Sequence, residues 1–398
     1  MTTHKLQYIE GLRGLAAVQV VLLHYFSAFL PFFAHFPGPV HFAWETTLRH
    51  TPLWFLLDGY SAVCLFFILS GFVLAPSFLK SEKPLPLLAT KRYLRLFVPI
   101  FSAFVVALTL YFLMPHAASD AATLSQSGWL VPPNNSLTIM SLIQDALLNS
   151  TLTGYSGSSL LDYLPNSPNF PVSAELSQAL NPPTWTMHVE FWGSMLVLAL
   201  AVLRRYVGGV KFSAIFVLVA FMIGTSYYSL FLFGFLLFQI RGNLLGPRHV
   251  IFALFGVALV LSGLYICINK NISAVGLVLT GLRHITLLSA KQGHLWQSQV
   301  GAMLIFGGVM LNVQLRSFLA VRVIQWLGKV SFSVYLLHVP ILLTFSSLVF
   351  TIFAQRSYAL ACIAAFVIGI GVTYAAAAIF EKNVDRRAVH FSKRIIGD

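Results

Sequence analysis

Long apolar runs recur along almost the whole chain, and they restrict the fold more than any other feature of the sequence. A transmembrane helix needs about 20 predominantly apolar residues. Ten runs account best for the sequence: 12–33, 54–77, 96–114, 186–203, 212–225, 227–240, 250–268, 299–315, 332–353 and 358–380. The chain is 58% hydrophobic and only 9% charged, which excludes a soluble domain because its surface would need far more charge. We therefore predict an all-α polytopic membrane helical bundle with about ten transmembrane helices.

Basic residues are distributed unevenly between the loops that join these runs. If the N-terminus is cytosolic, the far side keeps only these of the 25 Lys and Arg residues: Arg49, Lys270, Arg283, Lys291 and Arg356. Because cytosolic loops carry an excess of Lys and Arg, both termini are expected in the cytosol. The layout predicts a single domain, 1–398, with an outer loop at 115–184 and a short basic cytosolic tail at 382–398.

Some stretches need a separate interpretation. Segment 272–289 is apolar enough to span, but an eleventh span would move the basic tail to the far side, so we expect a membrane-contacting or re-entrant segment. The net charge of +13 comes from basic residues in the loops between the apolar runs, where they act as orientation signals. No nucleic-acid partner is therefore expected. The three cysteines lie inside apolar runs, where they predict buried side chains and no metal site: Cys64, Cys267 and Cys362.

The predicted outer loop has features of its own. Apolar residues follow helical spacing over 137–149, so this part could lie across the top of the bundle. Glycosylation sequons begin at Asn134, Asn149 and Asn271, all on the side assigned to the exterior. They permit a location in a eukaryotic secretory-pathway membrane or the plasma membrane.

The first apolar run carries two groups that lipid disfavours, Arg13 and His24, within EGLRGLAAVQVVLLHY. Ionisable residues inside a membrane span are by default candidates for a functional site. Eleven residues of helix make about three turns, so the two side chains lie on nearly one face. We expect Arg13 near a water boundary and His24 near mid-membrane, facing the same cavity. The alternative is an interfacial arginine and an unrelated core histidine.

Two further blocks contain candidate binding residues near the cytosolic opening of the expected cavity. Ser70 in LFFILSGF offers a hydroxyl, although Ser70-Gly71 also suits close helix packing. Lys91, Arg92 and Arg95 in KRYLRLFVP follow, where a cytosolic loop enters the third span. Guanidinium pairs at a helix end suit phosphate, whereas the alternative is anchoring by the positive-inside rule or by lipid headgroups.

The remaining candidates lie in two later blocks. NPPTWTMHVEF contains Trp185, and it brings His188 and Glu190 to the outer end of the fourth span. The alternative role for the acid is a structural ion pair or a charge at the helix N-terminus. GKVSFSVYLLHVP contains Tyr335 and places His338 about two turns into the ninth span. A lone histidine on an apolar face can also be a hydrogen-bonded core residue.

These blocks together resemble the membrane-bound acyltransferase-3 family, with Glu381 closing the last span, and they occur in the family's order. The family's Trp-Ser-Leu block reads Trp185-Thr186-Met187 here, which leaves His188 without family support. The resemblance implies about ten helices and transfer of an acyl group, commonly acetyl, from cytosolic acyl-coenzyme A to a hydroxyl. Family acceptors include cell-surface polysaccharides, glycolipids and secondary metabolites.

The residues allow a mechanism for such an O-acyltransferase. A neutral imidazole at His24 could take the acceptor proton, after which the acceptor oxygen attacks the thioester; an acyl-His24 intermediate is the competing route. The candidate residues divide into catalytic His24, Arg13 and Glu190; donor-binding Lys91, Arg92, Arg95 and Ser70; and substrate-binding His338, Trp185 and Tyr335. The expected partners are acyl-coenzyme A as co-substrate, a hydroxyl-bearing acceptor and the lipid bilayer. The alternative function is a proton-coupled multi-pass transporter that relays protons through the same His and Glu groups.

Overall fold

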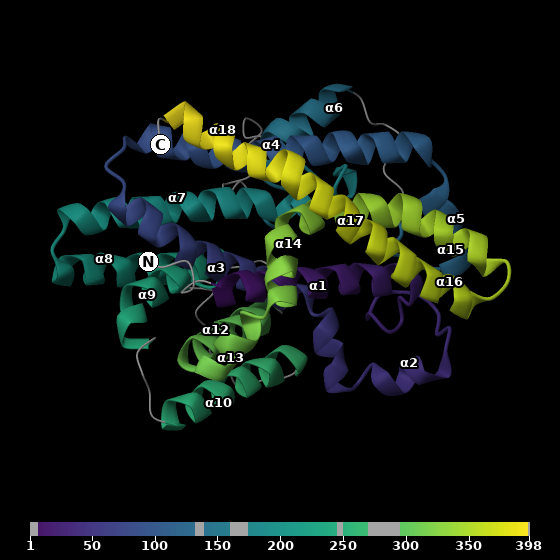
Figure 1. The fold of residues 1–398 in the computed structure, drawn as a ribbon, viewed down its shortest axis with the longest axis horizontal. Coiled ribbons are helices and arrows are strands. Elements are labelled where there is room, and N and C mark those ends of the chain that lie inside the picture. Colours follow the sequence, from purple (N-terminus) through teal and green to yellow (C-terminus); the bar gives the residue numbers. More distant parts are fainter. Residues whose placement is uncertain (1–6, 132–138, 160–173, 245–249, 270–294, 397–398) are drawn as a thin grey trace.

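The computed structural model describes residues 7–131, 139–159, 174–244, 250–269 and 295–396 (Figure 1). Within these residues the secondary structure is helical, and β-structure amounts to an isolated bridge between Tyr155 and Ala174. The all-α class predicted from the apolar runs is confirmed. The apolar segment 272–289 lies outside the described residues.

The described helices account for all ten expected apolar runs. Seven helical segments are long and apolar enough to cross a membrane, and the bent pair α12 (Leu295–Leu311) and α13 (Val313–Leu319) makes eight. The first five of the seven are α1 (Gln7–Phe29), α3 (Gly59–Lys80), α4 (Leu85–Leu113), α7 (Trp185–Tyr206) and α10 (Val250–Ile268). Two shorter apolar helices, α8 (Gly209–Ile223) and α9 (Tyr228–Leu244), lie at the fifth and sixth runs. The chain is a multi-pass membrane protein.

The last two long segments are interrupted by π-helical turns, which often mark functional positions. One segment consists of α14 (Arg322–Ile341), η7 (Leu342–Ser346) and α15 (Ser347–Ala354). The other consists of α16 (Tyr358–Ala364), η8 (Ala365–Gly369), α17 (Ile370–Phe380), η9 (Glu381–Asp385) and α18 (Arg386–Ile396). In Figure 1, α18 lies beside α4, against which it packs.

Glycines let α14 cross α1 closely near the middle of the bundle (Figure 1). A Cβ atom on Gly14 would lie 2.5 Å from the backbone nitrogen of Gly328, and one on Gly328 would lie 2.0 Å from the carbonyl oxygen of Glu10. Small residues at such crossings allow backbones to approach in membranes, where packing rather than hydrophobic burial drives association. The crossing keeps the later turns of both helices adjacent.

The packing role expected of Gly71 is also confirmed. A Cβ atom on Gly71 would lie 2.3 Å from the carbonyl oxygen of Phe231, and one on Gly234 would lie 2.1 Å from that of Ile68. Helices α3 and α9 therefore touch through their backbones at this point, one residue from Ser70.

Two helices begin well before the apolar runs that predicted them. Helix α4 begins at Leu85, behind Pro84, and α14 begins at Arg322, whereas the runs begin at 96 and 332. An apolar run marks only the part of a helix that contacts lipid or core, whereas backbone hydrogen bonding continues into polar residues. Arg92 and Arg95 therefore lie about two or more turns inside α4 and not at the end of a helix. His338 lies about four turns after the start of α14, although it is about two turns after the start of the apolar run.

Short helices occupy the connections. Two of them, α2 (Ala43–Leu48) and η2 (Pro52–Leu57), join α1 to α3. The segment 115–184 contains α5 (Ala117–Ser125), α6 (Ile139–Gln144), the π-helical η3 (Asp145–Thr153), η5 (Leu176–Gln178) and η6 (Pro182–Thr184). The helical spacing predicted for 137–149 is thus observed from 139 onward. Element η3 does not lie apart from the spans, because it packs against α4 and α7.

A buried carboxylate holds this segment together. Asp145 accepts hydrogen bonds from the Tyr155 hydroxyl at 2.5 Å, the Leu180 backbone nitrogen at 3.1 Å and Asn149 Nδ2 at 3.4 Å. Burial raises the pKa of the Asp145 carboxyl, and the three hydrogen bonds oppose this rise. These contacts connect η3 to the stretch just before η6, which precedes α7.

Candidate active site

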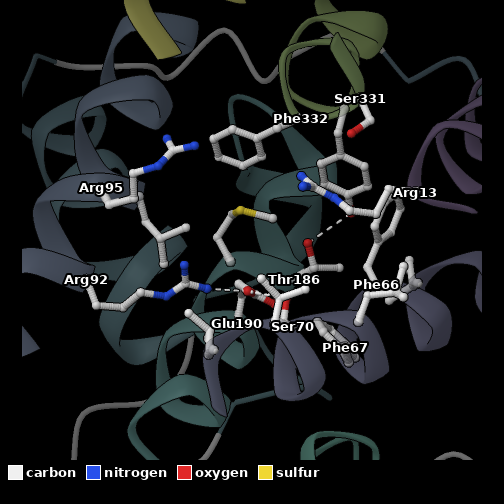
Figure 2. Close-up of a pocket in the computed structure, with 17 residues that line it drawn as sticks. Arg13, Phe66, Phe67, Ser70, Arg92, Arg95, Thr186, Glu190, Ser331 and Phe332 are labelled. Atoms are coloured by element: carbon white, nitrogen blue, oxygen red, sulfur yellow. Dashed lines mark hydrogen bonds and ion pairs between the residues drawn. The ribbon is translucent and has the colours of Figure 1, made fainter. Parts of the chain in front are cut away.

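A cavity of about 190 Å³ lies between α1, α3, α4, α7 and α14 (Figure 2). Its polar lining consists of three arginines, one glutamate and four hydroxyl-bearing residues: Arg13, Arg92, Arg95, Glu190, Ser70, Thr186, Ser331 and Tyr335. Aromatic and aliphatic side chains, among them Phe66 and Phe332, form the rest of the wall. Three guanidinium groups and one carboxylate give the lining a net positive charge, which favours an anionic ligand.

Arg92 and Glu190 form an ion pair that joins α4 to α7 (Figure 2). The Ser70 hydroxyl of α3 donates to the same oxygen of Glu190, Oε1, at 2.6 Å. The Arg92 and Glu190 side chains are only 15% and 12% exposed, so each charge compensates the other in a largely desolvated site. Within the described structure the buried Nε of Arg92 has no hydrogen-bond partner, so this guanidinium retains unused donor capacity.

This contact corrects the expected depth of Glu190. Glu190 lies in the second turn of α7, and Arg92 lies in the N-terminal part of α4. The sequence predicts these residues at opposite boundaries of the membrane, which is wrong because their side chains touch. The reason is that the segment before α7 packs into the bundle, so α7 begins within the bundle.

The other two arginines approach the cavity from different helices. Arg13 of α1 is about one-third exposed and donates to Glu10 at 3.3 Å, one helical turn away. Arg95 of α4 is paired with Asp385 of η9, and its guanidinium carbon lies 5.5 Å from the Phe332 ring centroid. Figure 2 shows the three guanidinium groups converging on the same space. Each is held by an acidic side chain that a stronger anion could displace.

Tyr335 and Thr186 form the polar wall of the cavity between α14 and α7. The Tyr335 hydroxyl donates to the Pro183 carbonyl at 2.9 Å and lies 2.9 Å from the Thr186 hydroxyl. The Tyr335 ring also lies close to a second polar cluster, since its centroid is 5.8 Å from that of His338.

His338 and His24 form a hydrogen-bonded pair where α14 meets α1. His24 Nδ1 is 2.8 Å from His338 Nε2, and the ring centroids are 4.9 Å apart. His338 is fully buried, whereas His24 is partly exposed, and its ring centroid lies 5.1 Å from that of Trp129 with the two planes tilted by 31°. The sequence predicts both histidines as candidates but does not predict that they touch.

The expectation that Arg13 and His24 face one cavity is not met. Arg13 lines the cavity of Figure 2, whereas His24 is not part of that lining. His24 lies near the C-terminal end of α1, because this helix begins at Gln7 and ends at Phe29. The arginine-lined cavity and the histidine pair are therefore neighbouring sites that share α1 and α14.

Comparison with known proteins identifies the family. A family model described as an acyltransferase domain, Acyl_transf_3, matches residues 6–381. The chain belongs to the acyltransferase-3 family. No curated protein and no solved structure matches it. Among the described elements, the match covers the helices from α1 to α17 and ends before α18.

Besides the histidine pair, three more candidate residues of the predicted blocks lie outside the cavity lining. Lys91 precedes Arg92 on α4 but does not line the cavity of this acyltransferase. Trp185 begins α7 and packs against Tyr227, with ring centroids 5.5 Å apart. His188 is buried, with one ring nitrogen 2.7 Å from the Trp185 carbonyl and the other 2.8 Å from that of Ser158. His188 therefore clamps the 139–159 segment to α7.

Two residues that contact these sites are not predicted from the sequence. Asp385, which holds Arg95, belongs to the tail KNVDRR, whose basic character conceals a single acid. Trp129, which lies against His24, belongs to a Ser- and Pro-rich stretch with no apolar periodicity. The sequence signals available are an acid next to arginines and a tryptophan in a polar segment. Neither signal predicts which residue the side chain contacts.

Proposed function

We propose that this acyltransferase moves an acyl group, acetyl being the expected one, from cytosolic acyl-coenzyme A to an acceptor hydroxyl. The acceptor class we propose is a glycan, a glycolipid or a hydroxyl-bearing secondary metabolite. One observation carries the proposal: an arginine-lined cavity lies one helical turn of α14 from a hydrogen-bonded histidine pair. The first feature suits a phosphate-bearing donor, and the second suits proton transfer from a hydroxyl.

In this proposal the arginines bind the donor. Arg92 and Arg95 face the cavity from one side and Arg13 from the other, so phosphates at the mouth would meet donors from two helices. The volume of about 190 Å³ is below the roughly 300–1,000 Å³ of sites that enclose a drug-sized ligand, so only part of the coenzyme would enter. Glu190 and Ser70 support this role by orienting Arg92. Lys91 would add charge at the mouth.

The chemistry would proceed at His24. Its Nε2 removes the acceptor hydroxyl proton while the oxygen forms a bond to the thioester carbonyl carbon. The carbon–sulfur bond then breaks, and the departing thiolate takes the proton from the imidazolium. Transfer through an acyl-His24 intermediate would use the same nitrogen as nucleophile. Tyr335 lies between cavity and histidine, which suits a residue that contacts substrate; Trp185 would act only through packing.

The orientation is part of the proposal. The loop charges favour cytosolic termini, with the arginine cavity opening on the cytosolic side in a secretory-pathway or plasma membrane. Thr123, exposed on α5, is a suitable cysteine position, whereas Ser125 is buried. With the three native cysteines replaced, Thr123→Cys should react with an impermeant maleimide from outside intact cells. Reaction only after permeabilisation would contradict this orientation.

A hydrogen-bonded histidine pair also fits the alternative of a proton-coupled transporter. Both functions need a proton to move at His24, but only the transferase needs a thioester donor. Membership of an acyltransferase family favours the transferase.

The deciding experiment uses purified protein in liposomes with radiolabelled acetyl-coenzyme A and extracted lipids and glycans. We expect label in an alkali-labile ester, formed by wild type and lost in His24→Gln. His390→Gln is the matched control, because His390 is exposed on α18. Absence of acceptor label with every extract, together with solute uptake driven by a proton gradient, would contradict the proposal.

A further inference from the structure

We propose that His338 is a positioning residue that holds His24 in the tautomer with its proton on Nδ1 and its lone pair on Nε2. The assignment of the proton follows from the hydrogen-bond donors and acceptors and from the burial of His338. Its consequence for catalysis rests on the proposed function. A histidine with an unprotonated Nε2 can act as a base there without first losing a proton.

The argument begins at the backbone of α14. His338 Nδ1 lies 3.0 Å from the carbonyl oxygen of Val334 and 2.8 Å from that of Tyr335. A carbonyl oxygen only accepts hydrogen bonds, so His338 Nδ1 must carry a proton and donate it. In a neutral imidazole the other nitrogen, Nε2, then bears a lone pair.

The second step passes from His338 to His24. His338 Nε2 is 2.8 Å from His24 Nδ1, so one nitrogen must donate to the other. Because His338 Nε2 bears the lone pair, His24 Nδ1 is the donor. In neutral His24 the remaining nitrogen, Nε2, is unprotonated. The His24 residue is itself partly exposed.

The opposite arrangement would need a doubly protonated His338. That ring is fully buried, and among the described residues no carboxylate forms an ion pair or hydrogen bond with either histidine. An unpaired buried charge is costly, so the neutral pair is favoured. The direction of the hydrogen bond is thereby set by the backbone of α14.

The backbone that sets the direction is itself held in place. Pro340 has no N–H, which leaves the carbonyl of Leu336 without its usual helical partner. Asn181, just before η6, supplies the missing donor, with Nδ2 2.8 Å from this carbonyl. The turn of α14 that carries His338 is therefore fixed to the block that begins α7. This rigidity suits a group that orients another.

The first test measures the tautomer directly. Protein labelled with ¹⁵N-histidine is studied in bilayers by solid-state NMR, and the His24 resonances are those lost in His24→Gln. We expect protonated Nδ1 and unprotonated Nε2 for His24 in wild type. His338→Gln should preserve this state, because its side-chain oxygen can still accept a hydrogen bond. His338→Leu should allow protonated Nε2 to appear.

A wild-type His24 protonated at Nε2 would overturn the inference, as would an unchanged tautomer in His338→Leu. This readout requires no turnover, so it stands even if acyl transfer is absent. If His338→Leu fails to fold, the wild-type and His338→Gln spectra still decide, since both must show an unprotonated Nε2.

The second test separates positioning from structure by kinetics. When the group that orients a catalytic histidine is lost, the wrong tautomer can lower kcat by up to about 10⁴. We expect His338→Leu to lower kcat by at least about 10² without changing the KM for acetyl-coenzyme A. His338→Gln should recover most of the rate. Equal rates in folded Leu and Gln variants would contradict a positioning role.

Discussion

The arginine-lined cavity and the histidine pair use the same helices but hold their side chains in opposite ways. In the cavity, charged side chains are held by other side chains, as Arg92 is by Glu190 and Arg95 by Asp385. In the pair, His338 is fixed by backbone carbonyls, and no charge is involved. Side-chain partners can be exchanged for a ligand, whereas backbone partners cannot. The first arrangement suits binding, and the second suits directed proton transfer.

The arginine-lined cavity and the histidine pair lie close together. Tyr335 lines the cavity, and its ring lies 5.8 Å from His338. Tyr335 thus connects the lining of the cavity to the histidine pair. Mutations should nevertheless separate the sites, because each affects a different step.

The largest effect should come from His24. His24→Gln keeps hydrogen bonding but cannot accept a proton, so we expect the transfer rate to fall by about 10²–10⁴. Product formation at saturating acetyl-coenzyme A measures this, with His390→Gln as control and Tm recorded for each protein. Nearly full turnover by the Gln variant would contradict the assignment of proton transfer to the histidine pair.

The next effect should come from Arg92 and should appear in donor binding. Losing a charge-assisted hydrogen bond to phosphate costs roughly 1.5–3 kcal/mol, so Arg92→Ala should weaken acetyl-coenzyme A binding about tenfold or more. Equilibrium binding at several salt concentrations checks this, with exposed Arg394→Ala as control. Since Arg92→Ala leaves the Glu190 carboxylate unpaired, Arg92→Ala/Glu190→Gln should recover folding but not affinity. Unchanged affinity would mean that Arg92 does not bind the donor and only forms a structural ion pair with Glu190.

A smaller effect of opposite sign should come from Asp385. Asp385→Asn removes the acid that competes with phosphate for Arg95, so donor affinity should rise by about two- to fivefold at low salt and less at high salt. Arg95→Ala should weaken binding under the same conditions. If both variants weaken binding equally, the pair acts as a structural tie between α4 and η9.

The smallest effect on transfer should come from Asp145, which contacts neither site. Burial raises the pKa of Asp145, so its contribution to stability is present below the ordinary value of about 3.9 and is lost as pH rises through the raised value. The Tm of wild type relative to Asp145→Asn should therefore fall across that range. Asp120→Asn, exposed on α5, is the control. Lost turnover in a folded Asp145→Asn protein would mean that this segment belongs to the site.

Hydropathy predicted which parts of the chain are helical, because a membrane span must be apolar throughout. It misplaced the starts of α4 and α14, where polar residues continue the helix. Arg13, Arg92 and Arg95 were recognisable as single charges next to apolar runs, and the structure brings all three to one cavity. Their acidic partners were harder to predict, since an ion pair depends on which helices are neighbours.

The histidine pair shows the same limit more clearly. His24 and His338 are each conspicuous in the sequence, but 314 positions separate them. Helical periodicity indicates the face on which a residue lies and not the helix that this face meets. The contact depends on the glycine crossing of α1 and α14 and on the placement of Pro340. Both are visible in the sequence only as isolated Gly and Pro residues.

The most direct measurement of the central claim is the affinity of purified His24→Gln for acetyl-coenzyme A. If the arginines bind the donor and His24 only transfers the proton, the Kd should stay within about twofold of wild type, as expected for independent sites, while turnover is lost. A non-transferable thioether analogue allows the same titration of wild type. A Kd weakened about tenfold or more in a protein of unchanged Tm would contradict the account, because His24 would then belong to the donor site.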